Sequence, residues 1–119
     1  LKPINVWYQV ACELMNQDFE LLYGRWDFAN MVAGYTDGKV TSGAWYGSPY
    51  QVLGYINAQD LYEPEDNDRA VYLIRDAELE DSMRIAEERG AQLTLVRQFW
   101  GVALYTSSEQ LMYLPENPA

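Results

Sequence analysis

Apolar residues recur at helical spacing in four stretches of the chain, and each stretch predicts a helix that buries one face. In the best-defined stretch, the residues expected to face the core are Leu79, Met83, Ile85 and Ala86. Gly90 should end this helix, because glycine readily adopts the left-handed conformation found at helix ends. Asp27 is expected to cap another helix, since its carboxylate can accept a backbone N–H. The predicted helices lie within residues 3–18, 27–35, 46–62 and 77–90.

Shorter runs, rich in residues that suit a pleated surface, predict strands. The run at residues 69–76 is apolar almost throughout, which is typical of a central strand buried on both faces. Asp37-Gly38 predicts a tight turn between a helix and a strand, because it supplies the positive φ that such a reversal needs. The predicted strands lie within residues 19–23, 39–45, 69–76, 91–100, 101–108 and 109–115.

The order of these elements predicts one α/β domain spanning residues 1–119, a length that suits a single core. Helices alternate with the first strands, which implies parallel pairing through helical crossovers. The last strands follow one another directly, which implies an antiparallel meander at the C-terminal side. We therefore expect a mixed sheet with helices packed on it.

Charge and composition exclude several classes of function. The formal charge of −10, with only eight Lys and Arg residues, argues against a nucleic-acid partner. The chain has no His, which excludes Ser-His-Asp and Cys-His catalysis and imidazole zinc sites within it. Its single cysteine, Cys12, lies among apolar residues and is expected to be a buried, inert thiol.

A glycine between a strand and a helix raises the question of a phosphate site in the segment "YGRWDFAN". A phosphate cradle needs several free backbone N–H groups, but this segment has only Gly24, and Asp27 would repel a phosphate. Gly24 is therefore expected to turn the chain, and no cofactor is predicted. The acidic run at residues 60–68 lacks the spacing of a calcium loop, so it predicts a solvated loop and no metal site.

Carboxylates could support acid–base chemistry near the predicted strand ends. Asp27 and Asp37 flank one helix, and Asp76 follows the predicted central strand, where open α/β sheets bind ligands. Capping explains these acids as well, and we expect the isolated chain not to be an enzyme. The enzymatic alternative is a small hydrolase that uses Asp27 and Asp76.

Aromatic residues cluster in the middle of the chain and allow two interpretations. Large aromatic rings pack in cores, but together with acids they also form surfaces that bind sugars or protein partners. Val52, Leu53 and Ile56 already give the helix expected after Ser48 and Pro49 an apolar face, so neighbouring rings are free for a loop surface. The residues of this candidate surface are Trp26, Trp45, Tyr46, Tyr50, Asp60 and Glu63.

The order of motifs resembles the soluble C-terminal domain of polytopic prokaryotic membrane proteins of the glycosyltransferase-C type, the dolichyl-phosphate-mannose-protein mannosyltransferase-like group. The resemblance covers roughly residues 4–106. The matching positions are Tyr23, Trp26, Asp37-Gly38-Lys39, Pro49-Tyr50, Tyr72-Leu73-Ile74 and the segment 101–105.

This resemblance implies a non-catalytic accessory domain on the extracytoplasmic side of a membrane, acting as a lid, a docking module or a glycan or acceptor recognition module. Its expected partners are the remainder of the parent membrane protein and a glycan or lipid-linked sugar acceptor. The start "LKPIN" would then follow a last membrane span. In that group the catalytic carboxylate lies between membrane helices, so no catalytic residue transfers to this chain. The alternative is a free cytoplasmic α/β domain that binds a small ligand at its strand ends.

Overall fold

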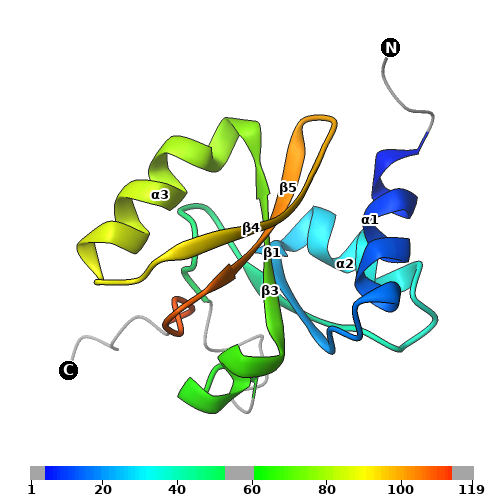
Figure 1. The fold of residues 1–119 in the computed structure, drawn as a ribbon, viewed down its shortest axis with the longest axis horizontal. Helices are drawn as coiled ribbons and strands as arrows, with labels where there is room; N and C mark the ends of the chain where they lie inside the picture. The colour runs from blue at the N-terminus through cyan, green and yellow to red at the C-terminus, as the bar shows by residue number, and fades with distance from the viewer. Residues whose placement is uncertain (1–4, 53–60, 114–119) are drawn as a thin grey trace.

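The computed structural model describes residues 5–52 and 61–113 and contains one five-stranded sheet with three α-helices (Figure 1). Two short 3₁₀ helices, η2 and η3, flank the third strand. The strands are β1 (Leu21–Arg25), β2 (Thr41–Trp45), β3 (Ala70–Arg75), β4 (Leu93–Phe99) and β5 (Val102–Ser107). The helices are α1 (Val6–Asn16), α2 (Trp26–Gly34), η2 (Pro64–Arg69), η3 (Asp76–Glu78) and α3 (Leu79–Glu88).

The sheet is mixed, as the sequence predicts, with strand order β2-β1-β3-β5-β4. β1 pairs in parallel with both β2 and β3, whereas β5 is antiparallel to β3 and to β4. β3 is the middle strand, and five of its six residues are buried. The expected α/β class and the central position of the strand predicted within residues 69–76 are therefore confirmed.

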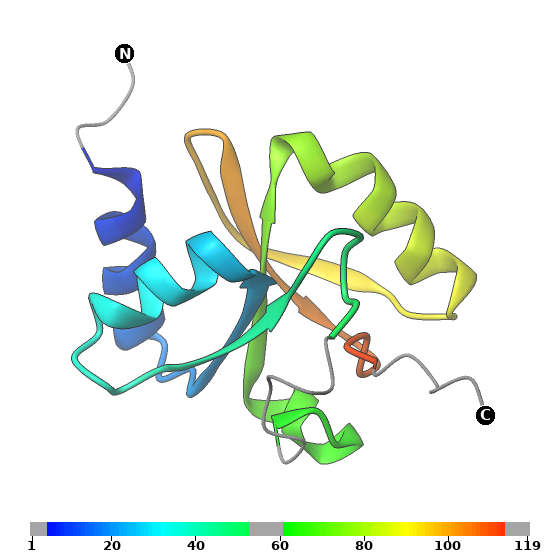
Figure 2. The ribbon, with the colours of Figure 1, turned by 180° about the vertical axis from the view of Figure 1, so that it is seen from behind.

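The helices cover both faces of the sheet, which produces two apolar layers. Figures 1 and 2 show α1 and α2 on one side of the central strands and α3 on the other. Val10 and Leu14 of α1 and Val32 of α2 are fully buried in the first layer. The second layer lies under α3 and is rich in aromatic rings, including Tyr23 and Tyr72.

Gly24 lies inside strand β1, so the expectation that it turns the chain is wrong. A Cβ atom at this position would lie 3.1 Å from the Cβ of Leu73 and 3.4 Å from the Cβ of Ala29. Glycine therefore lets the first turn of α2 pack closely against β1 and β3. Asp27 lies in the first turn of α2, and the residue at the cap position is Arg25.

The segments expected to form a helix within 46–62 and a strand within 109–115 pair with each other. Residues 46–52 are not helical, and Tyr50 has a left-handed φ of 71°. Val52 N–H donates to the carbonyl of Tyr113 at 2.9 Å, and Tyr113 N–H donates to the carbonyl of Tyr50 at 3.0 Å. The C-terminal segment thus packs beside residues 50–52 instead of extending the hairpin. The rest of these two predictions, residues 53–60 and 114–115, lies outside the described residues.

Turn predictions are confirmed at two sites, while two burial predictions are wrong. Asp37 and Gly38 have φ values of 57° and 83°, and Gly90 follows α3 with a φ of 71°. Met83, however, is 37% exposed, because Ser82 and Ala86 occupy the buried stripe of α3. Cys12 is only partly buried. Within residues 5–52 and 61–113, no helix combines the length and apolarity needed to cross a bilayer.

Candidate recognition site at the carboxyl edge of the sheet

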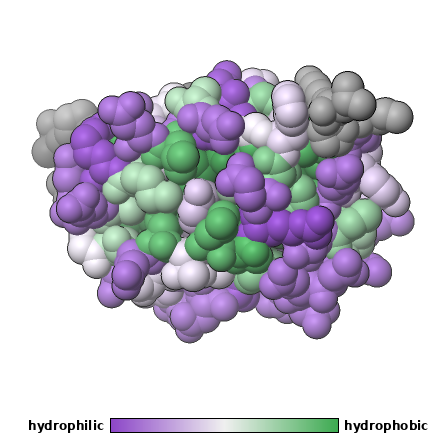
Figure 3. All heavy atoms as spheres, turned by 45° about the horizontal axis from the view of Figure 1, so that its top comes forward, coloured by the Kyte–Doolittle hydropathy of each residue, from purple (hydrophilic) through white to green (hydrophobic). Residues whose placement is uncertain are grey.

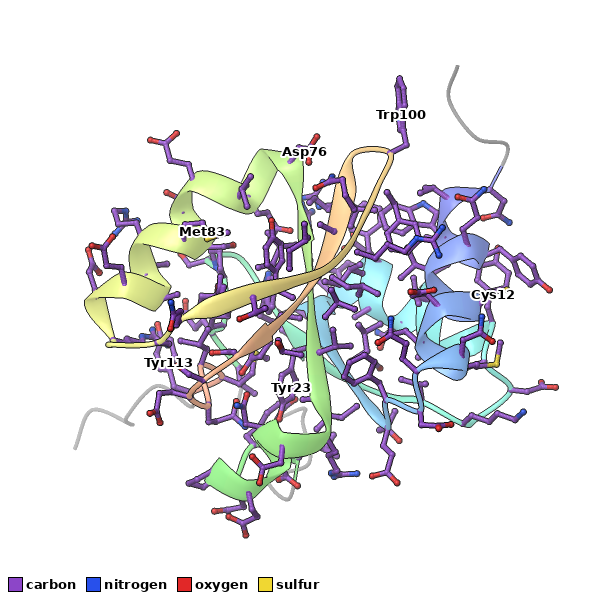
Figure 4. All side chains as sticks on the ribbon, in the orientation of Figure 1. Cys12, Tyr23, Asp76, Met83, Trp100 and Tyr113 are labelled. Atoms are coloured by element: carbon purple, nitrogen blue, oxygen red, sulfur yellow. The ribbon has the colours of Figure 1, made fainter. Side chains whose placement is uncertain are left out.

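The carboxyl ends of the three parallel strands meet at one edge of the sheet. Trp26 follows β1, Tyr46 follows β2 and Asp76 follows β3. The tight turn between β4 and β5 lies at the same edge, because the backbone N–H of Asp76 donates to the carbonyl of Gly101 at 3.0 Å. Figure 4 shows Asp76 and the side chain of Trp100 together at this end of the molecule. We call this region the carboxyl edge.

The junction between β1 and β3 at this edge is a topological switch point. After β1 the chain enters α2 on one face of the sheet, and after β3 it enters α3 on the opposite face. The two connections therefore diverge from neighbouring strand ends. Open α/β sheets bind ligands at such switch points.

Two exposed aromatic rings form a stacked pair at the carboxyl edge. The ring centroids of Trp26 and Tyr46 are 6.1 Å apart, with an angle of 11° between the ring planes. The pair follows from strand register, since Arg25 lies opposite Trp45 and the next residues are Trp26 and Tyr46. Trp26 is 46% exposed and Tyr46 is partly exposed. We refer to these two residues as the Trp26–Tyr46 pair.

Trp45 and Tyr50 are fully buried, so their expected place on an exposed surface is wrong. The indole Nε1 of Trp45 donates to Oε2 of Glu78 at 3.0 Å. The hydroxyl of Tyr50 donates to the carbonyl of Ser82 at 2.9 Å, and its burial raises the pKa to about 12. The physical reason is packing: Trp45 at the end of β2 and Tyr50 in the turn that follows both belong to the aromatic layer under α3.

Glu63, one of the two acidic candidates, does not rim the aromatic pair. Glu63 is exposed and precedes η2, which leads into the amino end of β3. Figure 1 shows η2, in green at the bottom, at the opposite end of the molecule from the tip of the β4–β5 hairpin. Asp60 lies outside the described residues. The structure therefore retains Trp26 and Tyr46 from the predicted surface, and separates Glu63 from them.

Two arginines that sequence reasoning missed occupy the switch point. Arg25 ends β1 and Arg75 ends β3, and their guanidinium carbons lie 6.0 Å and 4.6 Å from the ring centroid of Phe28. These distances fit cation–π contacts. The sequence signal is the arrangement "GRWD" and "IRDA", in which each apolar strand ends in an arginine followed within two residues by an acid.

Each arginine is paired with a nearby carboxylate. Arg25 Nε lies 3.3 Å from Oδ1 of Asp27, and Arg75 Nε lies 3.2 Å from Oε1 of Glu78. Glu78 is only 9% exposed and also accepts the Trp45 indole N–H. Asp27 and Asp76, the acids of the hydrolase alternative, both follow strand ends at the carboxyl edge.

A cleft lies between α1, α2 and the β4–β5 turn, next to Arg75. Trp7 and Phe28 stack at a centroid distance of 4.7 Å and form part of its wall. The cleft has a volume of about 250 Å³. Its lining residues are Val6, Trp7, Phe28, Arg75, Ala77, Trp100 and Gly101. Figure 3 turns the top of Figure 1 toward the viewer and shows apolar side chains exposed among polar ones on this side.

The edge thus combines aromatic faces, guanidinium donors and carboxylate acceptors. Among the described residues, no group of three or more Cys, Asp or Glu side chains is placed to hold a metal ion. Comparisons of the chain with models of known protein families, with curated proteins and with solved structures gave no match. The functional argument therefore rests on the chemistry of the carboxyl edge.

Proposed function

We propose that this chain is a non-catalytic recognition module that binds carbohydrate through the Trp26–Tyr46 pair at the carboxyl edge. The observation that carries the proposal is the pair itself, with its rings at an angle of 11° and Trp26 46% exposed. Exposed aromatic surface next to polar groups is typical of recognition sites. Flat aromatic faces stack on the C–H faces of sugar rings, while neighbouring donors and acceptors bind their hydroxyl groups.

Recognition is favoured over catalysis because two of the three acids at the edge, Asp27 and Glu78, have structural partners. Asp27 pairs with Arg25, and Glu78 is held by both Arg75 and the Trp45 indole. We expect purified chain not to turn over a glycosyl phosphate donor. Turnover that is abolished by Asp76→Ala would instead support the hydrolase alternative.

The resemblance to the tails of glycosyltransferase-C membrane proteins supports a setting for this module. In that setting the chain lies on the extracytoplasmic side and helps a membrane-bound parent hold a glycan or a lipid-linked sugar acceptor. The test is the coding sequence upstream of Leu1. Several spans of about 20 apolar residues there would support the membrane parent. A short polar start would favour the free cytoplasmic ligand-binding domain.

Calorimetric titration with a linear mannose oligosaccharide tests the binding function itself. Stacking on Trp26 is worth about 1 kcal/mol, so Trp26→Ala should raise Kd about fivefold. The matched control is Tyr35→Ala, because Tyr35 is 41% exposed and directly follows α2, at the opposite end of that helix from Trp26.

The control variant should bind like the parent chain. Equal losses of affinity in Trp26→Ala and Tyr35→Ala would contradict a site at the carboxyl edge. Absence of binding across mannose, glucose and N-acetylglucosamine oligosaccharides would contradict the carbohydrate function.

A further inference from the structure

The guanidinium of Arg75 is held in place against the ring of Phe28 at the cleft. Arg75 is 22% exposed, and its guanidinium carbon lies 4.6 Å from the ring centroid of Phe28. Its Nε is bound to Glu78, and Glu78 is in turn bound to the buried indole of Trp45. This chain of contacts fixes the guanidinium before any ligand arrives, which lowers the entropy cost of binding.

Arg75 keeps hydrogen-bonding capacity toward the cleft. A guanidinium carries five N–H donors, and only the Nε donor is used by Glu78. In the described parts of the chain, no residue accepts a hydrogen bond from the two Nη atoms of Arg75. Asp76, which is exposed beside Gly101, adds carboxylate acceptors at the same strand end.

Aromatic surface supplies the apolar part of the site. Trp7 and Phe28 stack on each other along one wall. Trp100, at the turn between β4 and β5, is 54% exposed and lines the cleft. Figure 4 shows its side chain extending from the hairpin tip beyond the ribbon. This exposed indole is available to a ligand held at the cleft.

The charge around the cleft disfavours an anionic ligand. Among the described residues, Arg75 is the one charged side chain that lines the cleft, and Glu78 is paired with it. At the carboxyl edge as a whole, Asp27, Asp76 and Glu78 outnumber Arg25 and Arg75. A phosphate or carboxylate would compete with Glu78 for Arg75 and meet repulsion from Asp76. A neutral ligand rich in hydroxyl groups can use the free donors of Arg75 and the aromatic faces together.

We infer that the cleft lined by Trp7, Phe28, Arg75 and Trp100 binds one neutral, polyhydroxylated sugar ring. This inference rests on the proposed carbohydrate function and adds a defined subsite to the Trp26–Tyr46 pair. The volume of about 250 Å³ lies below the range of about 300–1,000 Å³ typical of sites for drug-sized ligands, which fits a single ring.

Titration of the full chain with methyl α-glucopyranoside, followed by two-dimensional NMR, tests the subsite. The indole signals of Trp7 and Trp100 and the amide signals of Ala77 and Gly101 should shift together, with a millimolar Kd appropriate for so small a ligand. The matched anion is the methyl glucuronoside, which carries a carboxylate in place of the CH₂OH group. It should bind at least several-fold more weakly, and inorganic phosphate should not shift these signals.

Variants separate a binding role from a structural one. Trp100→Ala and Arg75→Lys should each raise Kd for the glucoside at least fivefold, the first by removing a ring and the second by removing the guanidinium fork. Leu95→Ala is the control, because Leu95 is 52% exposed on β4 and does not line the cleft. Its Kd should match that of the parent chain, and unchanged amide spectra of the core will show that all three variants are folded.

Three results would overturn the subsite, and they differ in what they say about the proposed function. If sugars shift only signals of the Trp26–Tyr46 pair, the subsite is wrong while the proposed function holds. If the glucuronoside or phosphate binds more tightly than the glucoside, the cleft is an anion site. If no sugar shifts any signal at the carboxyl edge, both the subsite and the proposed function fail.

Discussion

Replacing Trp45 with alanine should destabilise the protein far more than the same change at Trp26. Trp45 is fully buried, and truncation of a buried Trp costs about 3–5 kcal/mol. The change also removes the donor 3.0 Å from Oε2 of Glu78, which is 9% exposed, and leaving a buried acceptor unsatisfied costs about 1–3 kcal/mol more. The expected loss of about 4–8 kcal/mol is comparable to the whole stability of a small domain, about 5–15 kcal/mol.

Trp26→Ala is the matched comparison, because Trp26 is 46% exposed and its indole makes no hydrogen bond to the described residues. We expect it to change the free energy of unfolding by less than about 1 kcal/mol. Urea denaturation followed by far-ultraviolet circular dichroism measures both variants without relying on indole fluorescence. A Trp26→Ala variant as unstable as Trp45→Ala would refute the division between a buried and an exposed tryptophan.

Trp45→Phe separates the two parts of this cost. The phenyl ring keeps much of the buried contact, while the hydrogen bond to Glu78 is lost. We expect a loss of about 1.5–3 kcal/mol, the range for hydrogen bonds to charged groups. A loss as large as that of Trp45→Ala would mean that the hydrogen bond to Glu78, and not the packing of the ring, accounts for the cost of removing Trp45.

Two further predictions concern the core. Burial raises the pKa of Tyr23, Tyr50 and Tyr62 from 10 to about 12, which means that the folded chain favours the neutral phenol. The stability that these neutral phenols contribute is therefore fully present below about pH 10 and is lost as pH rises toward about 12. Over that range the free energy of unfolding should fall by about 1.4 kcal/mol per pH unit for each tyrosine. Urea titrations at about pH 9 and pH 11 should show this loss, and equal stability at both pH values would contradict it. Gly24→Val should lower stability by about 1–3 kcal/mol, because a Cβ there meets Leu73 at 3.1 Å. Thermal unfolding measures this loss, and the control is Gly34→Ala, where a Cβ meets no atom within 4 Å. A Gly24→Val variant with the same Tm as the control would disprove the close packing around Gly24.

The fold was predictable because its signals are local. Alternating helices and strands, the Asp37-Gly38 turn and the apolar run at residues 69–76 each depend on neighbouring residues. The segment at residues 109–113 was not predictable in this way. Leu111 and Met112 are both buried, so the segment lacks strand alternation, and its pairing with residues 50–52 is a long-range contact.

The candidate site was predictable only in part, because it depends on which side chains point into the core and on which strands are neighbours in the sheet. Both faces of the sheet are covered, so the sequence gives no polar–apolar alternation that would distinguish Trp45 from Tyr46. Arg25 and Arg75 are fifty positions apart and meet because β1 and β3 pair in parallel. That pairing places two strand ends side by side, and no short-range pattern in the sequence encodes it.

The most direct test of the carboxyl edge as a recognition surface uses the indole N–H signals of the four tryptophans. A linear oligosaccharide of three neutral sugars is titrated into the isotope-labelled chain. The account predicts that the Trp26 and Trp100 signals shift along one saturating curve while the signal of Trp45, buried and bonded to Glu78, stays in place. Saturable binding that moves neither Trp26 nor Trp100, or no binding at all, would contradict the account.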